Sequence, residues 1–483
     1  MTRSGSLILR LAAAGGAIVG SLVLVAAATS FFTASGPGTS TGPPTVTHPH
    51  SSSPMSLPQR FYGRYSHHLP TSTSFFPIIV WDQSPSGGDV PPPFRTQAQA
   101  FKAMGVNVFV AISGWPYGYG FDGRELADAC ANREYIIAGG DVRSNSSAQS
   151  VASVQAILKR NPKCAKYLVG YQMGIDEPQC STSVASLVAP IHAEDPTRMV
   201  YINQAGWYPN NMNPACRANL RATSVASADD YAITNPWNPP GPNRGCLRAP
   251  TDCLWQYGAE TDYMRADVGP NKPVWVFVET GTNTLGFPSQ NGSVCNAKTN
   301  LCSNGNEYRA TPPQVNSAAW LTIIHGSNGL EWFCDDTAAP DYCAGGGSNG
   351  HLAGDNRAIP ANLSYVDHAI ESFARELNVP NAKRAAIRSS NPRVPISEMV
   401  KVVNGITYLF VESDRNGATV ARFAFGRRLA GATATVVYDS DAHYHRAYSE
   451  SGKQIRLGAT GAFYDRLGLH GDNYQVKVYR ITG

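Results

Sequence analysis

The chain has 483 residues, of which 42% are hydrophobic and only 15% are charged, and its formal net charge is +4. This length allows a barrel domain of about 250 residues together with a smaller domain. The basic residues are scattered along the chain, without the Lys/Arg-rich run that follows a phosphate backbone. Nucleic-acid binding is therefore a poor hypothesis for this protein.

The first segment predicts export. Arg3 and Arg10 precede an apolar run from Leu11 to about Phe32, and small residues near the end of this run offer cleavage sites. This is the pattern of a secretory signal peptide, which we assign to residues 1–35. The alternative is an uncleaved anchor, because the run approaches the roughly 20 residues that span a bilayer. In both cases we expect the rest of the chain to be secreted or held at the cell surface, with membrane contact only if the segment stays uncleaved.

The ten cysteines agree with export. Their number is even, and none lies in the signal peptide or after residue 343. In an exported chain this pattern indicates disulfides, although the sequence leaves their connectivity open. No CxxC or Cys/His spacing indicates zinc, and we expect neither a metal nor another cofactor. We expect neighbouring cysteines to pair: Cys130 with Cys164, Cys180 with Cys216, Cys246 with Cys253, Cys295 with Cys302, and Cys334 with Cys343.

Residues 36–74 are rich in Ser, Thr, Pro, Gly and His, which predicts a linker that buries no core. From residue 75 onward, apolar strands alternate with helical patterns, and this alternation implies an α/β fold with a parallel sheet. Eight repeats favour a (β/α)8 TIM barrel over 75–382. The strands are expected at Phe75–Trp81, Val106–Ile112, Tyr135–Ala138, within Tyr167–Pro178, and at Met199–Asn203, Asp230–Thr234, Val274–Val278 and Gly329–Phe333. The helices are expected at Gln97–Met104, Glu125–Asn132, Ala152–Lys159, Val184–Ala193, Val315–His325 and Tyr365–Leu377.

Two regions depart from this alternation. Gly206–Lys272 is long and poorly periodic, so we expect an elaborated loop or a small subdomain there. Residues 383–483 predict a C-terminal antiparallel β-sandwich, because short alternating segments are separated by Gly, Asn-Gly and Asp turns. We interpret His443 and His445 as exposed polar positions on one of its strands. The segments are Met399–Val403, Thr407–Glu412, Ala418–Phe425, Ala432–Tyr438, Gln454–Leu457 and Tyr474–Ile481.

Two of the predicted barrel strands end near a carboxylate. The fourth run reads YLVGYQMGIDEP and leads to Glu177, and the seventh reads PVWVFVETG and leads to Glu279. Side chains at the carboxyl ends of barrel strands line the active site. A pair of carboxyl groups there can cleave a glycosidic bond, since one protonates the leaving oxygen and the other attacks the anomeric carbon. A separation of about 5–5.5 Å favours retention of configuration, and roughly 6.5 Å or more favours inversion.

These motifs and the strand order resemble clan A of the glycoside hydrolases, which are retaining (β/α)8-barrel glycosidases. The resemblance implies an acid/base at Glu177 in GIDEP and a nucleophile at Glu279 in VFVETG. It also implies sugar contacts at Tyr231 in DDYAITN and at Trp332 in GLEWFC, and a C-terminal β-sandwich. The chain departs from the family at Asp176, where Asn is usual and bonds the sugar 2-hydroxyl. An ionised Asp accepts such a bond but cannot donate one.

The remaining candidates are aromatic and polar side chains near strand ends. Aromatic planes cover the apolar faces of sugars, although ordinary core packing fits each Trp equally well. The residues that we assign to substrate binding are Asp176, Trp81, Asp82, Trp115, Asn203, Tyr231 and Trp332.

The sequence thus predicts a secreted retaining glycoside hydrolase that acts on an oligo- or polysaccharide of an extracellular or cell-wall glycan. The alternative is a non-catalytic carbohydrate-binding or cell-surface protein on a barrel scaffold, because barrels host many functions. A metal-dependent hydrolase is disfavoured, since His192 and His325 fall in helical segments. A Ser nucleophile is disfavoured, since the GxSxG patterns around Ser40 and Ser348 lack the strand–turn–helix context of a nucleophile elbow. The sugar, the linkage and the oligomeric state stay open.

Overall fold

The computed structural model describes residues 55–81, 84–86, 90, 93–111, 121–139, 150–172, 180, 183–204, 214–229, 232, 253–280, 310–333, 358–469 and 474–483. These residues belong to one compact unit, Pro54–Gly483. No helix among them has the length and apolarity that crossing a membrane requires.

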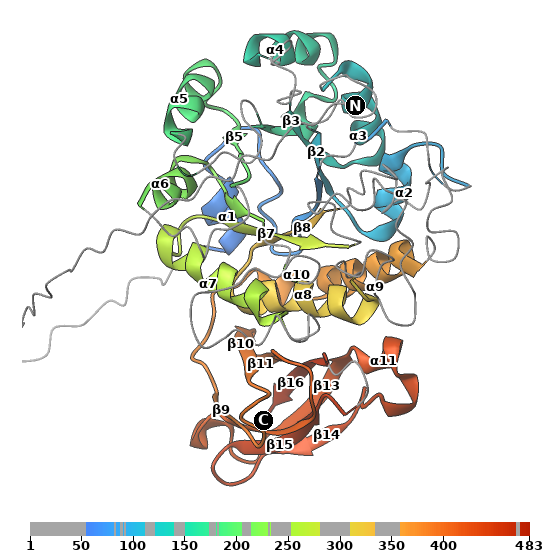
Figure 1. Cartoon of the computed structure of the whole chain (residues 1–483), viewed down its shortest axis with the longest axis vertical. Helices are drawn as coiled ribbons and strands as arrows, with labels where there is room; N and C mark the ends of the chain where they lie inside the picture. The colour runs from blue at the N-terminus through green and yellow to red at the C-terminus, as the bar shows by residue number, and fades with distance from the viewer. Residues whose placement is uncertain are drawn as a thin grey trace, which may run out of the picture. The chain divides into compact units, whose positions relative to one another are not determined.

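Eight parallel strands form a barrel with helices around it (Figure 1). They pair in the order β5-β4-β3-β2-β1-β8-β7-β6, and a parallel bridge between Gln204 and Ala228 joins the β5 side to β6. The predicted (β/α)8 barrel is therefore confirmed. The strands are β1 (Ile78–Trp81), β2 (Val108–Ala111), β3 (Tyr135–Gly139), β4 (Leu168–Gln172), β5 (Met199–Val200), β6 (Ala226–Ala228), β7 (Val274–Glu279) and β8 (Gly329–Phe333). The helices are α2 (Gln97–Met104), α3 (Gly123–Asn132), α4 (Val151–Arg160), α5 (Val184–Glu194), α6 (Pro214–Ala222), α7 (Trp255–Val268), α8 (Pro312–Ile324), α9 (Ala358–Ser372) and α10 (Ala374–Leu377), with a 3-10 turn at Ala165–Tyr167.

Composition explains why these strands form in the middle of the fold. β1, β2 and β7 read IIVW, VFVA and VWVFVE, and every residue in them is buried. β-branched and aromatic residues favour strands, and strands covered on both faces lose the polar alternation. Some of the helices begin at side-chain caps, as α2 does at Thr96, and α3 begins with a reciprocal capping box between Asp122 and Glu125.

A short helix closes the amino-terminal end of the barrel. This is α1 (Leu57–Tyr62), whose Phe61 and Tyr62 join the cluster of side chains along the barrel axis. Trp275, near the start of β7, donates a hydrogen bond through Nε1 to the Tyr62 hydroxyl at 3.0 Å. Residues 55–74, which we predicted as linker, therefore pack against the barrel, because their aromatic residues have a place to be buried.

The sixth strand and its surroundings correct the sequence interpretation. We predicted this strand at Asp230–Thr234, but Ala226–Ala228 pairs with β7. The sequence Ala-Ser-Ala contains none of the β-branched or aromatic residues that indicate a strand. The stretch that we expected to be an elaborated loop or subdomain contains two ordinary barrel helices, α6 and α7.

The C-terminal residues form two antiparallel sheets, with the orders β10-β11-β16-β13-β14 and β15-β12-β9. The sheets share a core that includes Leu409, Phe423 and Tyr479, which confirms the predicted β-sandwich. The strands are β9 (Ala386–Ser389), β10 (Ile396–Val403), β11 (Ile406–Ser413), β12 (Thr419–Ala424), β13 (Thr433–Asp439), β14 (Gln454–Arg456), β15 (Ala462–Leu467) and β16 (Val476–Thr482), with 3-10 turns at Arg427–Leu429 and Arg446–Tyr448. His443 is not on a strand as predicted, but in α11 (Asp441–Tyr444).

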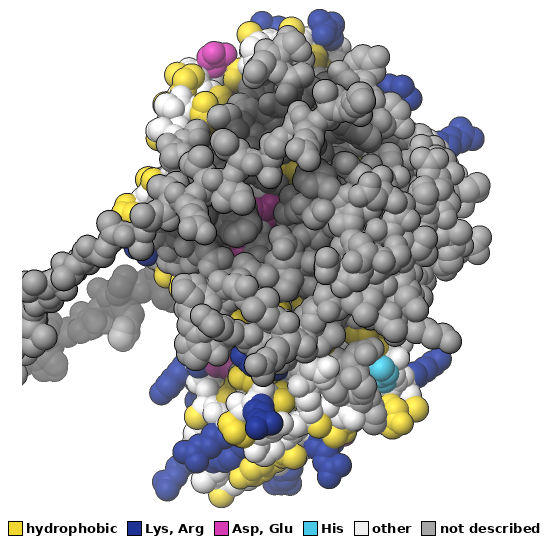
Figure 2. Space-filling model, in the orientation of Figure 1, with side chains coloured by type: hydrophobic (Ala, Val, Ile, Leu, Met, Phe, Trp, Pro, Cys, Tyr) yellow, Lys and Arg dark blue, Asp and Glu magenta, His cyan; other side chains and the backbone are white. Residues whose placement is uncertain are grey.

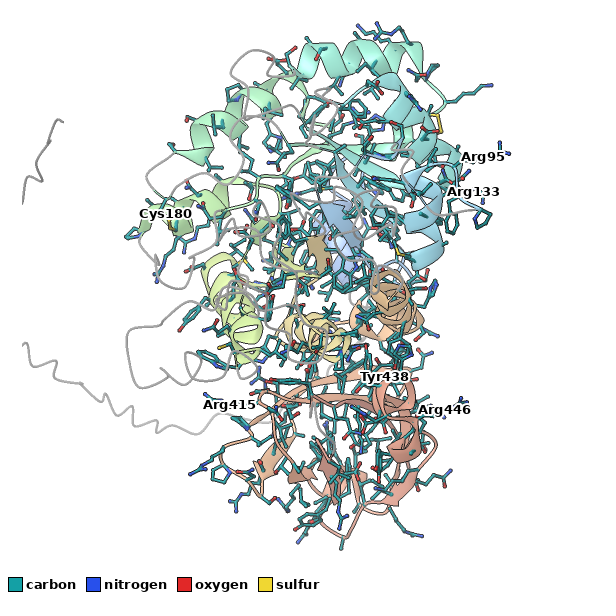
Figure 3. The ribbon with its side chains drawn as sticks, turned by 45° about the vertical axis from the view of Figure 1, so that its right-hand side comes forward. Arg95, Arg133, Cys180, Arg415, Tyr438 and Arg446 are labelled. Carbon is teal, nitrogen blue, oxygen red and sulfur yellow. A yellow bond between two sulfur atoms is a disulfide. The ribbon has the colours of Figure 1, made fainter. Side chains whose placement is uncertain are left out.

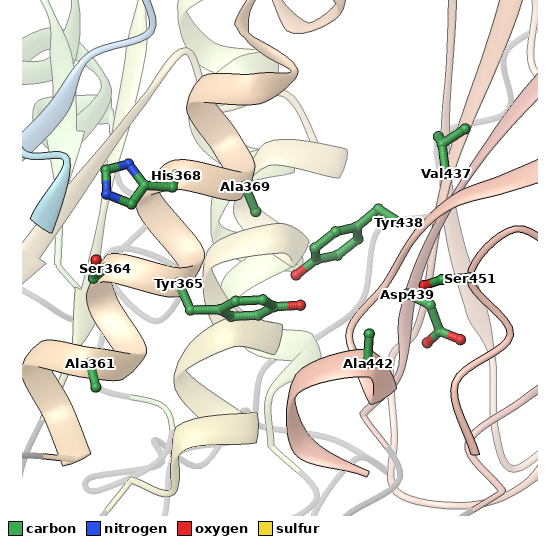
Figure 4. A pocket seen from close by; sticks show the side chains of 10 residues that line it. All are labelled: Ala361, Ser364, Tyr365, His368, Ala369, Val437, Tyr438, Asp439, Ala442 and Ser451. Carbon is green, nitrogen blue, oxygen red and sulfur yellow. The ribbon is translucent and has the colours of Figure 1, made fainter. Parts of the chain in front are cut away.

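The barrel and the β-domain share a buried contact. The ring of Trp320 on α8 lies 6.0 Å from that of Phe410 on β11 and 5.4 Å from that of Tyr438 on β13. Ser317 donates a hydrogen bond to the buried carboxylate of Glu412. Figure 4 shows Tyr365 of α9 and Tyr438 of β13 pointing toward each other, and their ring centroids are 6.1 Å apart. The β-domain is therefore packed on α8 and α9.

Two of the predicted disulfides are confirmed. Cys130 pairs with Cys164 and Cys180 with Cys216, with Cα–Cα distances of 5.4 and 4.5 Å (Figure 3). Cys253 is also disulfide-bonded. The other pairs that we predicted include cysteines outside the described residues: Cys246, Cys295, Cys302, Cys334 and Cys343.

We expect Phe61→Ala to lower the free energy of unfolding by about 3–5 kcal/mol, because it empties a buried site at the base of the barrel. Urea denaturation followed by tryptophan fluorescence measures this change. Met55→Ala is the matched control, since Met55 is 55% exposed and should tolerate the change. Equal stability of the two variants would mean that the packing of α1 against the amino-terminal end of the barrel does not stabilise the fold.

Candidate active site

Glu279 is the best-defined candidate catalytic residue. Trp275 and Phe277 of β7 belong to the axis cluster, so the two-residue period of the strand points Glu279 to the axis as well. It is the last residue of β7 and only 2% exposed. The Tyr257 hydroxyl on α7 donates a hydrogen bond to Glu279 Oε1 at 2.8 Å. This bond orients the carboxylate and stabilises its negative charge.

Trp81 lies at the same level of the barrel as Glu279. Strand register pairs Glu279 with Phe333 of β8, and Phe333 with Trp81 of β1. The ring centroids of Trp81 and Phe333 are 5.7 Å apart. The structure therefore brings together two of the residues that we predicted for the site, with an aromatic side chain between them.

Three of the buried polar atoms that have no hydrogen-bond partner among the described residues lie at or just after the carboxyl ends of barrel strands. They are Trp81 Nε1 at the end of β1, Gln172 Oε1 at the end of β4 and Asn203 Nδ2 just after β5. Each unpaired buried group costs about 1–3 kcal/mol. The carboxyl ends of parallel strands meet at one end of a barrel, so these atoms mark a place where a polar ligand can supply the partners. Gln172 was missed by sequence reasoning, although it ends an otherwise apolar strand.

A polar network lies among the axis-facing side chains. The carboxylate atom Glu331 Oε2 accepts hydrogen bonds from Tyr201 at 3.0 Å and from Ser227 at 2.8 Å. Ser227 Oγ also lies 3.3 Å from Asn203 Oδ1, which connects the network to a predicted site residue. Burial raises the pKa of Glu331 to about 8, against the opposing effect of the two hydroxyl donors. Sequence reasoning missed Glu331, whose signal is an acid between Leu330 and Trp332 in a buried strand.

Trp332 does not face the site. It belongs to the cluster between the strands and the helices, and its Nε1 donates a hydrogen bond to Asp367 Oδ1 on α9 at 2.9 Å. A fully buried ring in this position cannot cover a sugar, so the substrate contact that we predicted does not fit the structure. Its neighbour Phe333 takes the axis-facing place, because successive residues of a strand point to opposite sides.

The other predicted site residues, Glu177, Asp176, Asp82, Trp115 and Tyr231, lie outside the described residues. In the part of the chain that the structure does describe, no three His, Cys, Asp or Glu side chains are grouped so that they could hold a metal ion.

No family model matches the chain. No curated protein matches it.

Three of the solved structures that are similar to the chain match most of its length. A glycoside hydrolase family 5 protein from Bacteroides vulgatus has 14% identity and a TM-score of 0.45, with 84% of this chain and 89% of that one covered. A GH30 endoxylanase from Clostridium papyrosolvens has 10% identity and a TM-score of 0.41, with coverage of 85% and 97%. An alpha-amylase from Geobacillus thermoleovorans, complexed with acarbose, has 8% identity and a TM-score of 0.43, with coverage of 85% and 99%.

The raised pKa of Glu331 has a measurable consequence for stability. Between the usual value near 4.5 and about 8, the folded state holds a proton on this carboxyl that the unfolded state has released. Stability must therefore fall as pH rises through this window. We expect Glu331→Gln to remove that fall, so that the stability of the variant relative to wild type increases from pH 5 to pH 8.

Urea denaturation at a series of pH values measures this difference. Glu194→Gln serves as the control, because Glu194 is exposed at the end of α5 and should leave the pH profile unchanged. A constant difference between wild type and Glu331→Gln across the window would show that Glu331 is not held neutral.

Proposed function

We propose that this protein is a secreted glycoside hydrolase that cleaves O-glycosidic bonds with retention of configuration. One observation carries the proposal: a buried carboxylate, Glu279, ends β7 of a (β/α)8 barrel and is oriented by the hydroxyl of Tyr257. A carboxylate fixed at the carboxyl end of a barrel strand is positioned for catalysis. The predicted signal peptide and the two confirmed disulfides support export of the chain.

The proposed reaction is a double displacement. Glu279 attacks the anomeric carbon while Glu177 protonates the leaving oxygen, which breaks the glycosidic bond and forms a glycosyl ester. Glu177 then takes a proton from water, whose oxygen displaces Glu279 from the anomeric carbon. The sum is the addition of one water molecule across the glycosidic bond. Glu177 follows the end of β4 at Gln172 by a few residues in the sequence, which supports its proposed role.

The unpaired polar atoms at the carboxyl end of the barrel support a carbohydrate as the ligand. A sugar carries hydroxyls that both donate and accept, so it can satisfy the indole donor of Trp81, the amide donor of Asn203 and the amide acceptor of Gln172. Asp176, Asp82, Trp115 and Tyr231 remain proposed substrate contacts on the strength of their positions in the sequence. The substrate that we propose is an oligo- or polysaccharide of an extracellular or cell-wall glycan.

The test is hydrolysis of a panel of aryl glycosides and cell-wall polysaccharides by the secreted chain. We expect Glu279→Gln to reduce kcat by more than about 10³-fold and Glu177→Gln by about 10²–10⁴-fold, with folding intact. NMR of the first-formed anomer should show retention. Glu194→Gln controls for the loss of a carboxylate elsewhere on the barrel.

Two results would contradict the proposal. Full activity in a folded Glu279→Gln variant would show that Glu279 is not the nucleophile. A product with inverted configuration would rule out the double displacement. Binding of a glycan without any cleavage would favour a carbohydrate-binding protein on a barrel scaffold.

Tyr257 is proposed as a positioning residue for Glu279. Tyr257→Phe removes one hydrogen bond to a charged group, worth about 1.5–3 kcal/mol, so we expect a fall in kcat of about 10- to 100-fold with a smaller change in KM. Tyr263→Phe on the same helix is the matched control, since Tyr263 is 42% exposed and should leave both constants unchanged. Equal kcat for the two variants would show that the Tyr257 hydroxyl has no role in the reaction.

A further inference from the structure

The sheet formed by β9, β12 and β15 has one covered and one open face. Its inner face, which includes Ala421, Phe423 and Phe463, packs in the core of the β-sandwich. The five-stranded sheet on the other side of that core is the one that contacts α8 of the barrel. The outer face of the three-stranded sheet therefore has no element of the described chain over it.

Strand register places basic and aromatic side chains side by side on this outer face. Arg422 in the middle strand pairs with Arg388 on one side and with Tyr464 on the other. Because neighbouring strands lie about 4.8 Å apart, this row is about 10 Å long. Arg466 follows in the next row, and Tyr464 is 62% exposed.

The three arginines of this face, Arg388, Arg422 and Arg466, have no acidic neighbour on it. The remaining outward positions are Ala386, Val420, Ala424 and Ala462. Within the described chain, no ion pair or side-chain hydrogen bond engages the three guanidinium groups. Like charges directly opposite each other on neighbouring strands are destabilising, so the pair Arg388 and Arg422 would be stabilised by an anion between them.

The whole β-domain has an excess of basic over acidic residues. Residues 383–483 contain 15 Lys and Arg but only 8 Asp and Glu. Residues 1–382, in contrast, contain 24 Lys and Arg and 27 Asp and Glu. None of the described acidic side chains in the domain is fully exposed. Asp465, for example, is buried against Lys477 and Lys453 between the sheets. Figure 2 shows Lys and Arg side chains gathered on the β-domain, in the lower part of the picture.

We propose that the outer face of β9, β12 and β15 binds a polysaccharide that carries carboxylate groups, such as a chain of uronic acids. Planar guanidinium groups bind carboxylates through two parallel hydrogen bonds, which favours arginine over lysine at such a surface. The exposed ring of Tyr464 can cover the apolar face of one sugar. The small alanine side chains beside the row leave a flat surface on which an extended chain can lie. The choice of a polysaccharide rests on the proposed function, whereas the charge complementarity is independent of it.

The experiment measures binding of the full-length Glu279→Gln chain, which leaves the polymer uncut, to polygalacturonate by affinity electrophoresis and calorimetry. The same polymer with its carboxyl groups methyl-esterified is the neutral comparison. We expect Arg388→Gln/Arg422→Gln to weaken binding of polygalacturonate at least tenfold and Tyr464→Ala to weaken it about fivefold. Binding of the esterified polymer should be at least tenfold weaker in the parent chain.

The matched control is Arg446→Gln/Arg480→Gln, which removes the same charge from exposed positions elsewhere on the domain. It should change the dissociation constant less than threefold. Equal weakening by both double variants would mean a diffuse charge effect and would overturn the proposal. The proposal would also be overturned if the chain bound double-stranded DNA or phosphatidylglycerol vesicles more tightly than polygalacturonate at the same salt concentration. Each of these outcomes is independent of whether wild type hydrolyses any glycoside.

Discussion

Successive side chains of a barrel strand point alternately to the axis and to the helices, and the site depends on this constraint. On β7 it directs Trp275, Phe277 and Glu279 inward, which brings a carboxylate to the end of the axis. On β8 it directs Glu331 and Phe333 inward and sends Trp332 toward α9. The same alternation therefore decides which side chains can reach a substrate and which only hold the helices on the barrel.

The two ends of the axis are built differently. At the amino-terminal end, Tyr62 accepts the hydrogen bond of Trp275, and aromatic packing closes the interior. Toward the other end, Glu331, Asn203 and Ser227 form a buried polar network. Two buried atoms of these residues, Glu331 Oε1 and Asn203 Nδ2, have no hydrogen-bond partner among the described residues. Unpaired buried polar groups oppose folding, so the packing of the apolar layers must offset their cost. A stable amino-terminal end and a polar carboxyl end are consistent with the hydrolase that we propose.

Most of the architecture could be predicted from the sequence, because long buried strands and capped helices leave strong local signals. The strand Ala226–Ala228 could not, since its small residues look like a loop and only its pairing with β7 makes it a strand. The resemblance placed Trp332 in the site, and the sequence could not correct this, because a strand buried on both faces shows no alternation that tells inward from outward. Tyr257 was missed for a different reason, since nothing in its local sequence indicates that α7 delivers a hydroxyl to Glu279. The basic face of the β-domain could not be predicted either, because its arginines are scattered along the chain and only strand register aligns them.

In the reaction that we propose, Glu279 becomes covalently bonded to the sugar. The most direct measurement is mass spectrometry of the protein after reaction with a 2-deoxy-2-fluoro glycoside of the sugar that the activity panel identifies. Such a compound slows the second displacement, so that the glycosyl ester accumulates. We expect a mass increase of one glycosyl group, located by peptide mapping on Glu279 and absent in Glu279→Gln. A label on another residue, or active protein that forms no adduct and releases the inverted anomer, would contradict it.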